Sequence, residues 1–400
     1  MPSSYTMKNG KDRKGNQKFC PDPKKFLFNI DTFWYNVDIL NYDDVMENGL
    51  LEELENGRQL HMDYNEEKTV EVRLPSYENP LVFVVKGGQK PLYQFSLRND
   101  DIAIFFSRRY RHDGQYPIKV QINQFLLWDK GLINAFAESL SVLMSFGFAV
   151  GKAKMNRIDF AVHSDQWQWL LDDLRTFEYP RNFKDDNKPD FYRLDPCSGE
   201  FETVYFGNRT RLQLRIYNKT KEIMKKGKMY FLDLYNSLDM DTENIWNVEF
   251  EVRRDFLKEC EDEEGLKIFD DLEEVFNRDG LDKLWTMLME KFYHKSAFWT
   301  LLSKGAKGKF ARTTGYLIRT KDVDSNFDRE VAQIRGRLMT AVVNDEKCDI
   351  ETAIKKFLIK NRQYEERKGK SFKEDVEKKK MLLHDYEINK TIKKNPLIKK

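Results

Sequence analysis

Residues 156–165 read NRIDFAVHSD, and apolar and polar side chains alternate along this stretch. The apolar positions are Ile158, Phe160 and Val162, and the polar positions between and beside them are Arg157, Asp159 and His163. Side chains two residues apart lie on the same face of a β-strand, so such a strand has one apolar face and one polar face. The stretch therefore predicts a strand that buries one face in a core and presents the acid Asp159 on the other.

Two later stretches repeat this alternation. Residues 211–219 read RLQLRIYNK, and residues 247–255 read NVEFEVRRD. The polar face of the first carries Gln213, Arg215, Tyr217 and Lys219, and that of the second carries Asn247, Glu249, Glu251 and Arg253. Any half-solvated strand alternates in this way. The prediction of chemistry therefore depends on the coincidence of all three polar faces.

Three of these polar positions are acids, namely Asp159, Glu249 and Glu251. If the three strands pair in one sheet, their carboxylates converge, and neighbouring carboxylates repel each other unless a cation lies between them. Oxygen ligands suit a hard cation such as Mg²⁺ or Mn²⁺. Such an ion polarises a phosphoryl oxygen and stabilises developing negative charge. The pattern predicts a divalent metal site for phosphate chemistry, with these three acids as its ligands.

Tyr217 lies among cations: Arg209, Arg211 and Arg215 precede it, and Lys219 follows it. The ordinary pKa of a tyrosine hydroxyl is about 10, and nearby cations and a metal ion lower the pKa of a phenol. A phenolate is the form that attacks phosphorus. We therefore predict that Tyr217 is a nucleophile and that the four cations contact a DNA backbone.

Two further residues compete for a role in such a site. Tyr205, in TVYFGN, is a rival nucleophile, but its neighbours Val204 and Phe206 are apolar and no cation follows before Arg209, so a packing role is expected. His163 could be a further ligand, although a solvent-facing or hydrogen-bonded histidine is the commoner outcome.

The chain as a whole reads as an α+β fold. Strand-like stretches rich in aromatic and β-branched residues begin at Phe26, and helical spacings cover 131–147 and 167–177. No strand pattern returns after about Asp262, where helical spacings continue. We expect a flexible basic leader at 1–25, a catalytic domain at 26–260 with two β-rich lobes at about 26–130 and 131–260, and a helical, basic C-terminal region at 261–400.

Charge is spread unevenly over the 400 residues. The formal net charge is only +2, but residues 361–400 hold 13 Lys and Arg against 7 Asp and Glu, a net of +6. The first 25 residues are basic too. Basic ends suggest contact with a polyanion, and a solvated tail is the alternative.

Several protein classes are disfavoured. The four cysteines lie far apart, so neither a zinc site nor a disulfide framework is expected. No apolar run is long enough for a bilayer, and the amino terminus lacks a signal-peptide core, so we expect a cytoplasmic protein without a membrane partner. The segment SKGAKGKF has the wrong spacing for a phosphate-binding loop, so no ATPase is expected.

Together, NRIDFAVHSD, VYFGNRTRLQLRIYNKTKEI and WNVEFEVRRDF resemble the three core motifs of rolling-circle replication initiators of the Rep_trans type. That family includes initiators of small staphylococcal plasmids and nicking relaxases of some conjugative elements. The resemblance covers roughly residues 26–260, with the motifs in the family's order. It implies a Rep-like antiparallel sheet with packed helices. It also implies an enzyme that nicks and joins origin DNA, with Tyr217 as nucleophile and the three acids as ligands of Mg²⁺ or Mn²⁺.

The implied reaction acts on an extruded or melted single strand of a duplex origin. It forms a 5′-phosphotyrosine and leaves a free 3′-hydroxyl that primes synthesis. The expected partners are origin DNA, a host helicase and a polymerase, with a homodimer as one alternative for the oligomeric state. Related initiators with a different metal site use two histidines around one apolar residue, a spacing absent from this sequence. A relaxase for conjugative transfer and a non-catalytic DNA-binding regulator remain alternatives.

Overall fold

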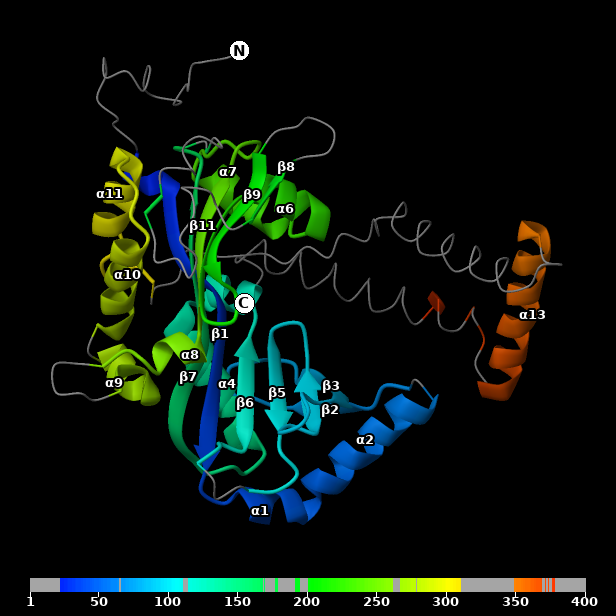
Figure 1. Ribbon diagram of the computed structural model, residues 1–400. Helices are drawn as coiled ribbons and strands as arrows, with labels where there is room; N and C mark the ends of the chain where they lie inside the picture. The colour runs from blue at the N-terminus through cyan, green and yellow to red at the C-terminus, as the bar shows by residue number, and fades with distance from the viewer. Residues whose placement is uncertain are drawn as a thin grey trace, which may run out of the picture. The chain divides into compact units, whose positions relative to one another are not determined.

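The computed structural model describes residues 22–64, 66–110, 114–167, 169, 177–178, 191–194, 201–261, 267–277, 279–310, 349–368, 371, 373 and 376–377 (Figure 1). The chain forms two compact units, Met1–Leu317 and Ile318–Lys400. The described part of the second unit contains α13, Ile350–Lys368. Most of the predicted leader, most of the helix predicted at 167–177 and much of the basic C-terminal region lie outside the described residues.

One eleven-stranded sheet runs through the first unit, in the order β2-β3-β4-β5-β6-β1-β7-β11-β10-β9-β8. Every neighbouring pair is antiparallel. The strands are β1 Phe26–Ile39, β2 Thr69–Val72, β3 Leu81–Gly87, β4 Phe95–Arg98, β5 Ile102–Phe106, β6 Ile118–Ile122, β7 Val150–Ser164, β8 Phe191–Leu194, β9 Phe201–Asn208, β10 Leu212–Asn218 and β11 Trp246–Arg253. Because β1 pairs with β6 on one side and β7 on the other, the two predicted β-rich lobes share one continuous sheet.

The three stretches that alternate in sequence are adjacent strands. NRIDFAVHSD lies in and just after β7, which pairs with β11, and β11 pairs with β10. Each buries its apolar positions almost completely: Ile158, Phe160, Leu214, Ile216, Phe250 and Val252 have 0% exposed surface. The prediction that the three stretches are strands with one apolar face is confirmed.

Helices cover the apolar face. They are α4 Leu132–Ser145, α9 Leu272–Asn277, α10 Gly280–Lys291 and α11 Ala297–Gly305. The Trp285 ring on α10 lies 5.8 Å from the ring of Phe160 and 5.4 Å from that of Phe250. In Figure 1, α10 and α11 (yellow) run along one side of the strands. The first helices after residue 260 therefore complete the core of the sheet, as a helical cap would.

Short helices lie on the polar face near the start of β1. These are α3 Gln124–Lys130, α6 Lys219–Lys226 and α7 Tyr230–Ser237. They enclose a small second core around Trp128 and Phe231. The His163 ring stacks on Trp128, and its Nδ1 hydrogen-bonds the Tyr235 hydroxyl at 2.8 Å. Burial lowers the pKa of His163 well below its ordinary value. In this structure His163 is a hydrogen-bonded histidine, which was the commoner outcome expected for it.

Lys219 does not lie on the strand, where the sequence pattern placed it. β10 ends at Asn218, whose side chain accepts a hydrogen bond from the Lys221 backbone and caps α6. Lys219 is thus the first residue of a helix and leaves the alternation of the strand. The remaining elements of the described chain are η1 Pro23–Lys25, α1 Tyr42–Val45, η2 Met46–Leu50, α2 Leu51–Tyr64, α8 Arg254–Leu257 and η3 Ile268–Asp270.

The described parts of 261–400 contain α9, α10, α11, α13 and η3. Residues 311–348 and 381–400 lie outside the described ranges. That the whole region is helical stays a prediction.

Candidate active site

The three predicted acids lie together on the polar face of the sheet. Asp159 on β7 is directly opposite Glu251 on β11, and Glu249 is directly opposite Arg215 on β10. Their exposed fractions are 1% for Asp159, 3% for Glu249 and 2% for Glu251. Antiparallel pairing thus brings carboxylates from positions 90 residues apart in sequence into one buried cluster.

One guanidinium nitrogen is shared by all three carboxylates. The Arg215 Nη2 atom lies 3.3 Å from Asp159 Oδ2 and 3.4 Å from Glu251 Oε2, and it also donates to Glu249 Oε1. The Nε atom of Arg215 is buried and has no hydrogen-bond partner among the described residues. Arg215 therefore offsets part of the negative charge of the acid cluster, while its Nε donor stays unused.

Two more arginines complete the charge balance. Arg157 donates from Nε to Asp159 Oδ1 at 2.7 Å, and its Nη2 lies 3.0 Å from Glu251 Oε2. Arg253 donates from Nε to Glu251 Oε1 at 2.6 Å. Burial raises the pKa of Asp159 to about 7, against the opposing effect of Arg157. Three carboxylates face three guanidinium groups, so the cluster is near neutral when Asp159 is ionised.

One oxygen from each acid points to a common position, and oxygen atoms are the ligands that a hard divalent cation prefers. In the conformation described, that position holds the Arg215 guanidinium. Among the residues that the structure describes, no group of three or more His, Cys, Asp or Glu side chains has metal-binding geometry as it stands. Binding of an ion by these acids would thus require Arg215 to move away from them.

The Tyr217 hydroxyl reaches the same cluster. It donates to Glu249 Oε2 at 2.8 Å and accepts from Asn247 Nδ2 at 2.8 Å, while Lys219 Nζ lies 3.4 Å away. The two oxygens of Glu249 therefore have different partners: Oε1 faces Arg215, and Oε2 faces the Tyr217 hydroxyl.

The prediction that the pKa of Tyr217 is lowered overall is wrong for this conformation. Burial, followed by the charges of Glu249, Glu222 and Asp31, raises the pKa of Tyr217 well above 10. The charge of Arg215 lowers this pKa, but burial and the three acids outweigh it. Lys219, which has no exposed surface, lies 2.7 Å from Glu222 and 3.6 Å from Asp31.

The other predicted DNA contacts are spread out. The structure brings Arg215 and Lys219 to the cluster, but not Arg209 or Arg211. Arg209 is exposed in the turn between β9 and β10. Arg211 is also exposed and pairs with Glu259 through two hydrogen bonds.

Sequence reasoning missed roles for Arg157, Asn247 and Asp31. Arg157 and Asn247 each stand two residues before an acid of the cluster, so the period of two already placed them on its face. Asp31 on β1 pairs with Lys219 and accepts a hydrogen bond from the Trp128 indole at 2.5 Å. No local signal linked Asp31 to the other motifs.

The packing role predicted for Tyr205 stays a prediction. Val204 and Phe206 are fully buried, but Tyr205 is half-buried and stands directly opposite Arg215 across the β9–β10 pair. It therefore lies on the polar face, beside the acid cluster, and must be tested as a rival to Tyr217.

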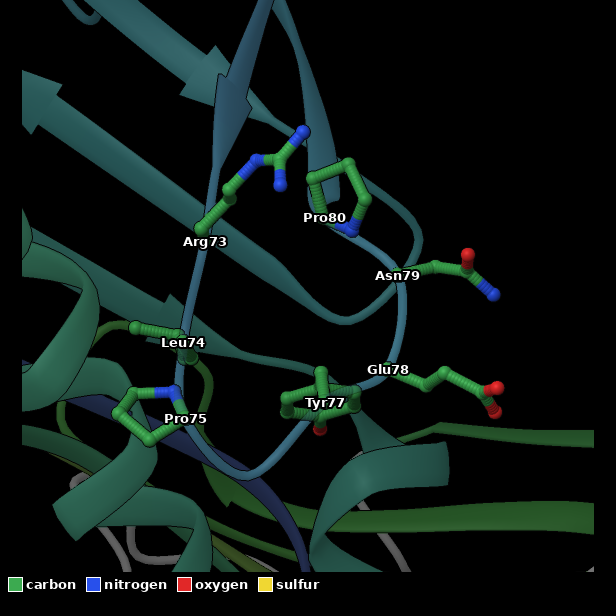
Figure 2. Close-up of a pocket in the computed structure, with 7 residues that line it drawn as sticks. All are labelled: Arg73, Leu74, Pro75, Tyr77, Glu78, Asn79 and Pro80. Atoms are coloured by element: carbon green, nitrogen blue, oxygen red, sulfur yellow. The ribbon is translucent and has the colours of Figure 1, made fainter.

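A pocket of about 320 Å³ lies elsewhere, in the loop between β2 and β3. Its lining residues are Arg73, Leu74, Pro75, Tyr77, Glu78, Asn79 and Pro80. Figure 2 shows that the side chains of Glu78 and Asn79 point away from the loop. The pocket contains none of the converging groups of the acid cluster, so we do not place the chemistry there.

Comparisons with known proteins give a distant likeness in structure. No family profile matches the chain, and no curated protein matches it. A solved structure described as a rolling circle replication initiator protein from Geobacillus stearothermophilus is similar, with a TM-score of 0.36 and 13% sequence identity. The match covers 72% of this chain and 99% of that chain.

Within the described ranges, none of the helices has both the length and the apolar character needed to cross a bilayer.

Proposed function

We propose that this protein is a rolling-circle replication initiator that nicks single-stranded origin DNA by transesterification, with Tyr217 as the nucleophile. The observation that carries the proposal is the Tyr217–Glu249 contact at the edge of a buried cluster of three acids. A phenol beside a carboxylate has a proton acceptor in place. Three carboxylates that share one cation position suit the binding of a phosphodiester through a divalent ion.

The Tyr217 oxygen attacks the phosphorus, the bond from phosphorus to O3′ breaks, and the phenol proton passes to Glu249 Oε2. The O3′ atom takes a proton from solvent and becomes the free 3′-hydroxyl. The products are a 5′-phosphotyrosine on the protein and a 3′ end that can prime synthesis.

Neighbouring side chains stabilise the charge that develops on the Tyr217 oxygen. Asn247 Nδ2 and Lys219 Nζ both point at this oxygen, so two donors are in place when the proton leaves. Donors that are fixed before reaction cost no reorganisation during it. Lys219 is too deeply buried to bind a backbone phosphate in this conformation, and its role here is to support the nucleophile.

Asp159, Glu249 and Glu251 would hold Mg²⁺ or Mn²⁺, which supplies Lewis-acid activation of the scissile phosphate. Arg215 would then leave its central position. Its guanidinium, including the unpartnered Nε, would be released beside a phosphate, a ligand that suits arginine. This exchange accounts for an arginine at the centre of the acids.

The decisive experiment is Tyr217→Phe with Tyr205→Phe as its matched control. Both changes remove one hydroxyl from the polar face. Wild type and Tyr205→Phe should cleave a single-stranded origin oligonucleotide and form a covalent adduct that is visible on a denaturing gel. Tyr217→Phe should form none. An adduct that survives in Tyr217→Phe and disappears in Tyr205→Phe would transfer the role to Tyr205.

Metal dependence separates the enzymatic proposal from a non-catalytic regulator. EDTA should stop cleavage, and added Mg²⁺ or Mn²⁺ should restore it. Full cleavage without metal would exclude the proposed role of the acids, and DNA binding without any cleavage would favour the regulator. A relaxase would use the same chemistry, so only a test on origin and transfer-origin sequences distinguishes it.

Duplex origin binding is proposed for the part of the basic C-terminal region beyond the helical cap. Lys and Arg outnumber acids there, and cations bind the DNA backbone. Since α10 contributes core residues to the sheet, a truncation near Asp262 would expose that core. A chain ending after Leu317, at the limit of the first unit, is the better test. It should keep single-strand cleavage and bind duplex origin more weakly.

A further inference from the structure

A second cluster lies on the same polar face, next to the acids, and contains cations around one indole ring. Trp34 on β1 is half-buried. Lys119 Nζ lies 4.4 Å from the centre of its ring, the Arg157 guanidinium carbon 4.7 Å and that of Arg253 5.1 Å. Three cations from strands β6, β7 and β11 therefore gather at one aromatic side chain.

Strand register makes this cluster continuous with the candidate active site. Trp34 stands directly opposite Arg157, and two residues earlier on the same strand Thr32 stands opposite Asp159. Arg157 contacts both the indole and Asp159. A DNA strand whose scissile phosphate lies at the acid cluster would thus reach Trp34 with a neighbouring phosphate.

Lys119 is the cation without an acid. Its ammonium donates to Gln89 Oε1 at 2.9 Å, and no carboxylate lies within ion-pairing distance of it in the part of the chain that the structure covers. Its other contacts are the rings of Trp34 and Phe105. Burial, and then the charges of Arg253 and Arg157, lowers the pKa of Lys119 to about 8. A cation held against two others, with only rings and an amide near it, gains from a bound anion.

We propose that Trp34, Lys119 and Arg253 form a subsite for a backbone phosphate of single-stranded DNA, adjacent to the scissile position. The inference rests on the proposed nicking function and adds the place where the strand is held. The cations supply charge, and the indole fixes them in position by cation–π contact. Single-strand binding proteins combine the same two elements, a positive surface and aromatic side chains.

The test is the affinity for an oligothymidylate of about 20 nucleotides, measured by fluorescence anisotropy over a range of salt concentrations. Lys119→Gln should lower affinity several-fold and reduce the salt slope by about 0.7, the value for one phosphate contact on a single strand. Lys119→Arg should restore both. Trp34→Leu should weaken binding as well, because it removes the platform of all three cations.

Lys309→Gln is the matched control. Lys309 also lies over an aromatic ring, 4.7 Å from the centre of Phe28, and Phe28 belongs to the core on the helix-covered face. The Lys309→Gln variant should bind the oligonucleotide as tightly as wild type does. If Lys119→Gln melts like wild type and keeps its affinity and salt slope, the subsite does not exist and the cluster only stabilises the sheet.

The outcome is separable from that of the nicking proposal. Binding of the oligothymidylate requires neither cleavage nor an origin sequence. Cleavage that depends on Tyr217 together with an unchanged Lys119→Gln would overturn the subsite alone. A salt slope that falls in Lys119→Gln while wild type never cleaves would overturn the nicking function and leave a single-strand binding surface.

Discussion

The cations in the two halves of the polar sheet face have different kinds of partner. In the acid half, on β7, β11 and β10, the guanidinium groups of Arg157, Arg215 and Arg253 pair with buried carboxylates. In the aromatic half, on β5, β6 and β1, Lys119 lies over Trp34 and the Phe105 ring with only an amide partner.

This difference suggests which ligand each half takes. A carboxylate cluster already balanced by arginines can exchange its counter-ions for a divalent cation. Lys119, which has no carboxylate partner among the described residues, can accept an anion. Because Arg157 contacts both halves, a metal ion in one and a phosphate in the other would support each other's binding. A substrate that carries phosphates and needs a metal for its cleavage suits both halves together.

The largest expected effect is on the free energy of unfolding, through the helix packing that lies beneath the strands. Trp285→Ala would leave a cavity beneath β7 and β11, because this ring packs on Phe160 and Phe250. The free energy of unfolding should fall by about 3–5 kcal/mol, measured by urea denaturation. Met224→Ala, at an exposed position of α6, should change it by less than about 0.5 kcal/mol. Equal stability of the two variants would show that α10 does not belong to the core.

A change within the acid half should affect chemistry and leave binding intact. Glu251→Gln removes one proposed ligand and keeps the shape of the side chain. Cleavage of the origin oligonucleotide should fall by about 100-fold or more, while the affinity for oligothymidylate should be unchanged or tighter, since a negative charge is lost.

The matched control is Glu259→Gln, because Glu259 also pairs with an arginine, Arg211, but lies outside the site and is exposed. It should cleave at the wild-type rate. If Glu251→Gln cleaves normally, or loses affinity and cleavage to the same extent, the division of roles between the halves is wrong.

The smallest expected effect is a pH dependence confined to the aromatic half. The pKa of Lys119, about 8 in the free protein, should rise when a phosphate binds. Oligothymidylate affinity should therefore fall as pH rises above about 8, by a few-fold, and Lys119→Arg should remove this fall because arginine stays charged. The same drop in both proteins would assign the titration to another group.

The stability of the folded chain should depend on the titration of the same lysine. A pKa lowered from 10.5 to about 8 means that the unfolded chain binds this proton more tightly than the folded chain. Burial of the charged lysine should thus lower the stability of the folded chain by its full amount below pH 8, and this loss should be relieved as pH rises from 8 toward 10.5. The difference in Tm between wild type and Lys119→Gln should therefore stay constant below pH 8 and change only between pH 8 and 10.5.

Local alternation along the chain was enough to assign the faces of the strands. A period of two is a local property, since it depends only on how successive side chains leave an extended backbone. It therefore placed Asp159, Glu249 and Glu251 on polar faces, together with Arg215 and Tyr217, and predicted buried partners such as Phe160. The helix at 131–147 followed from local spacing in the same way, and α4 spans Leu132–Ser145.

Only the tertiary structure decided what surrounds these residues. Lys219 looks like a DNA contact in sequence, but the cap at Asn218 turns the chain into α6 and buries it against Asp31, about 190 residues away. The pKa of Tyr217 rises because burial and acids from three elements outweigh its neighbouring cations. The grouping of Lys119 and Arg253 around Trp34 needs strand pairings between distant segments. Burial, cross-strand distance and long-range charge are set by which strands become neighbours, and alternation within one strand carries no information on that choice.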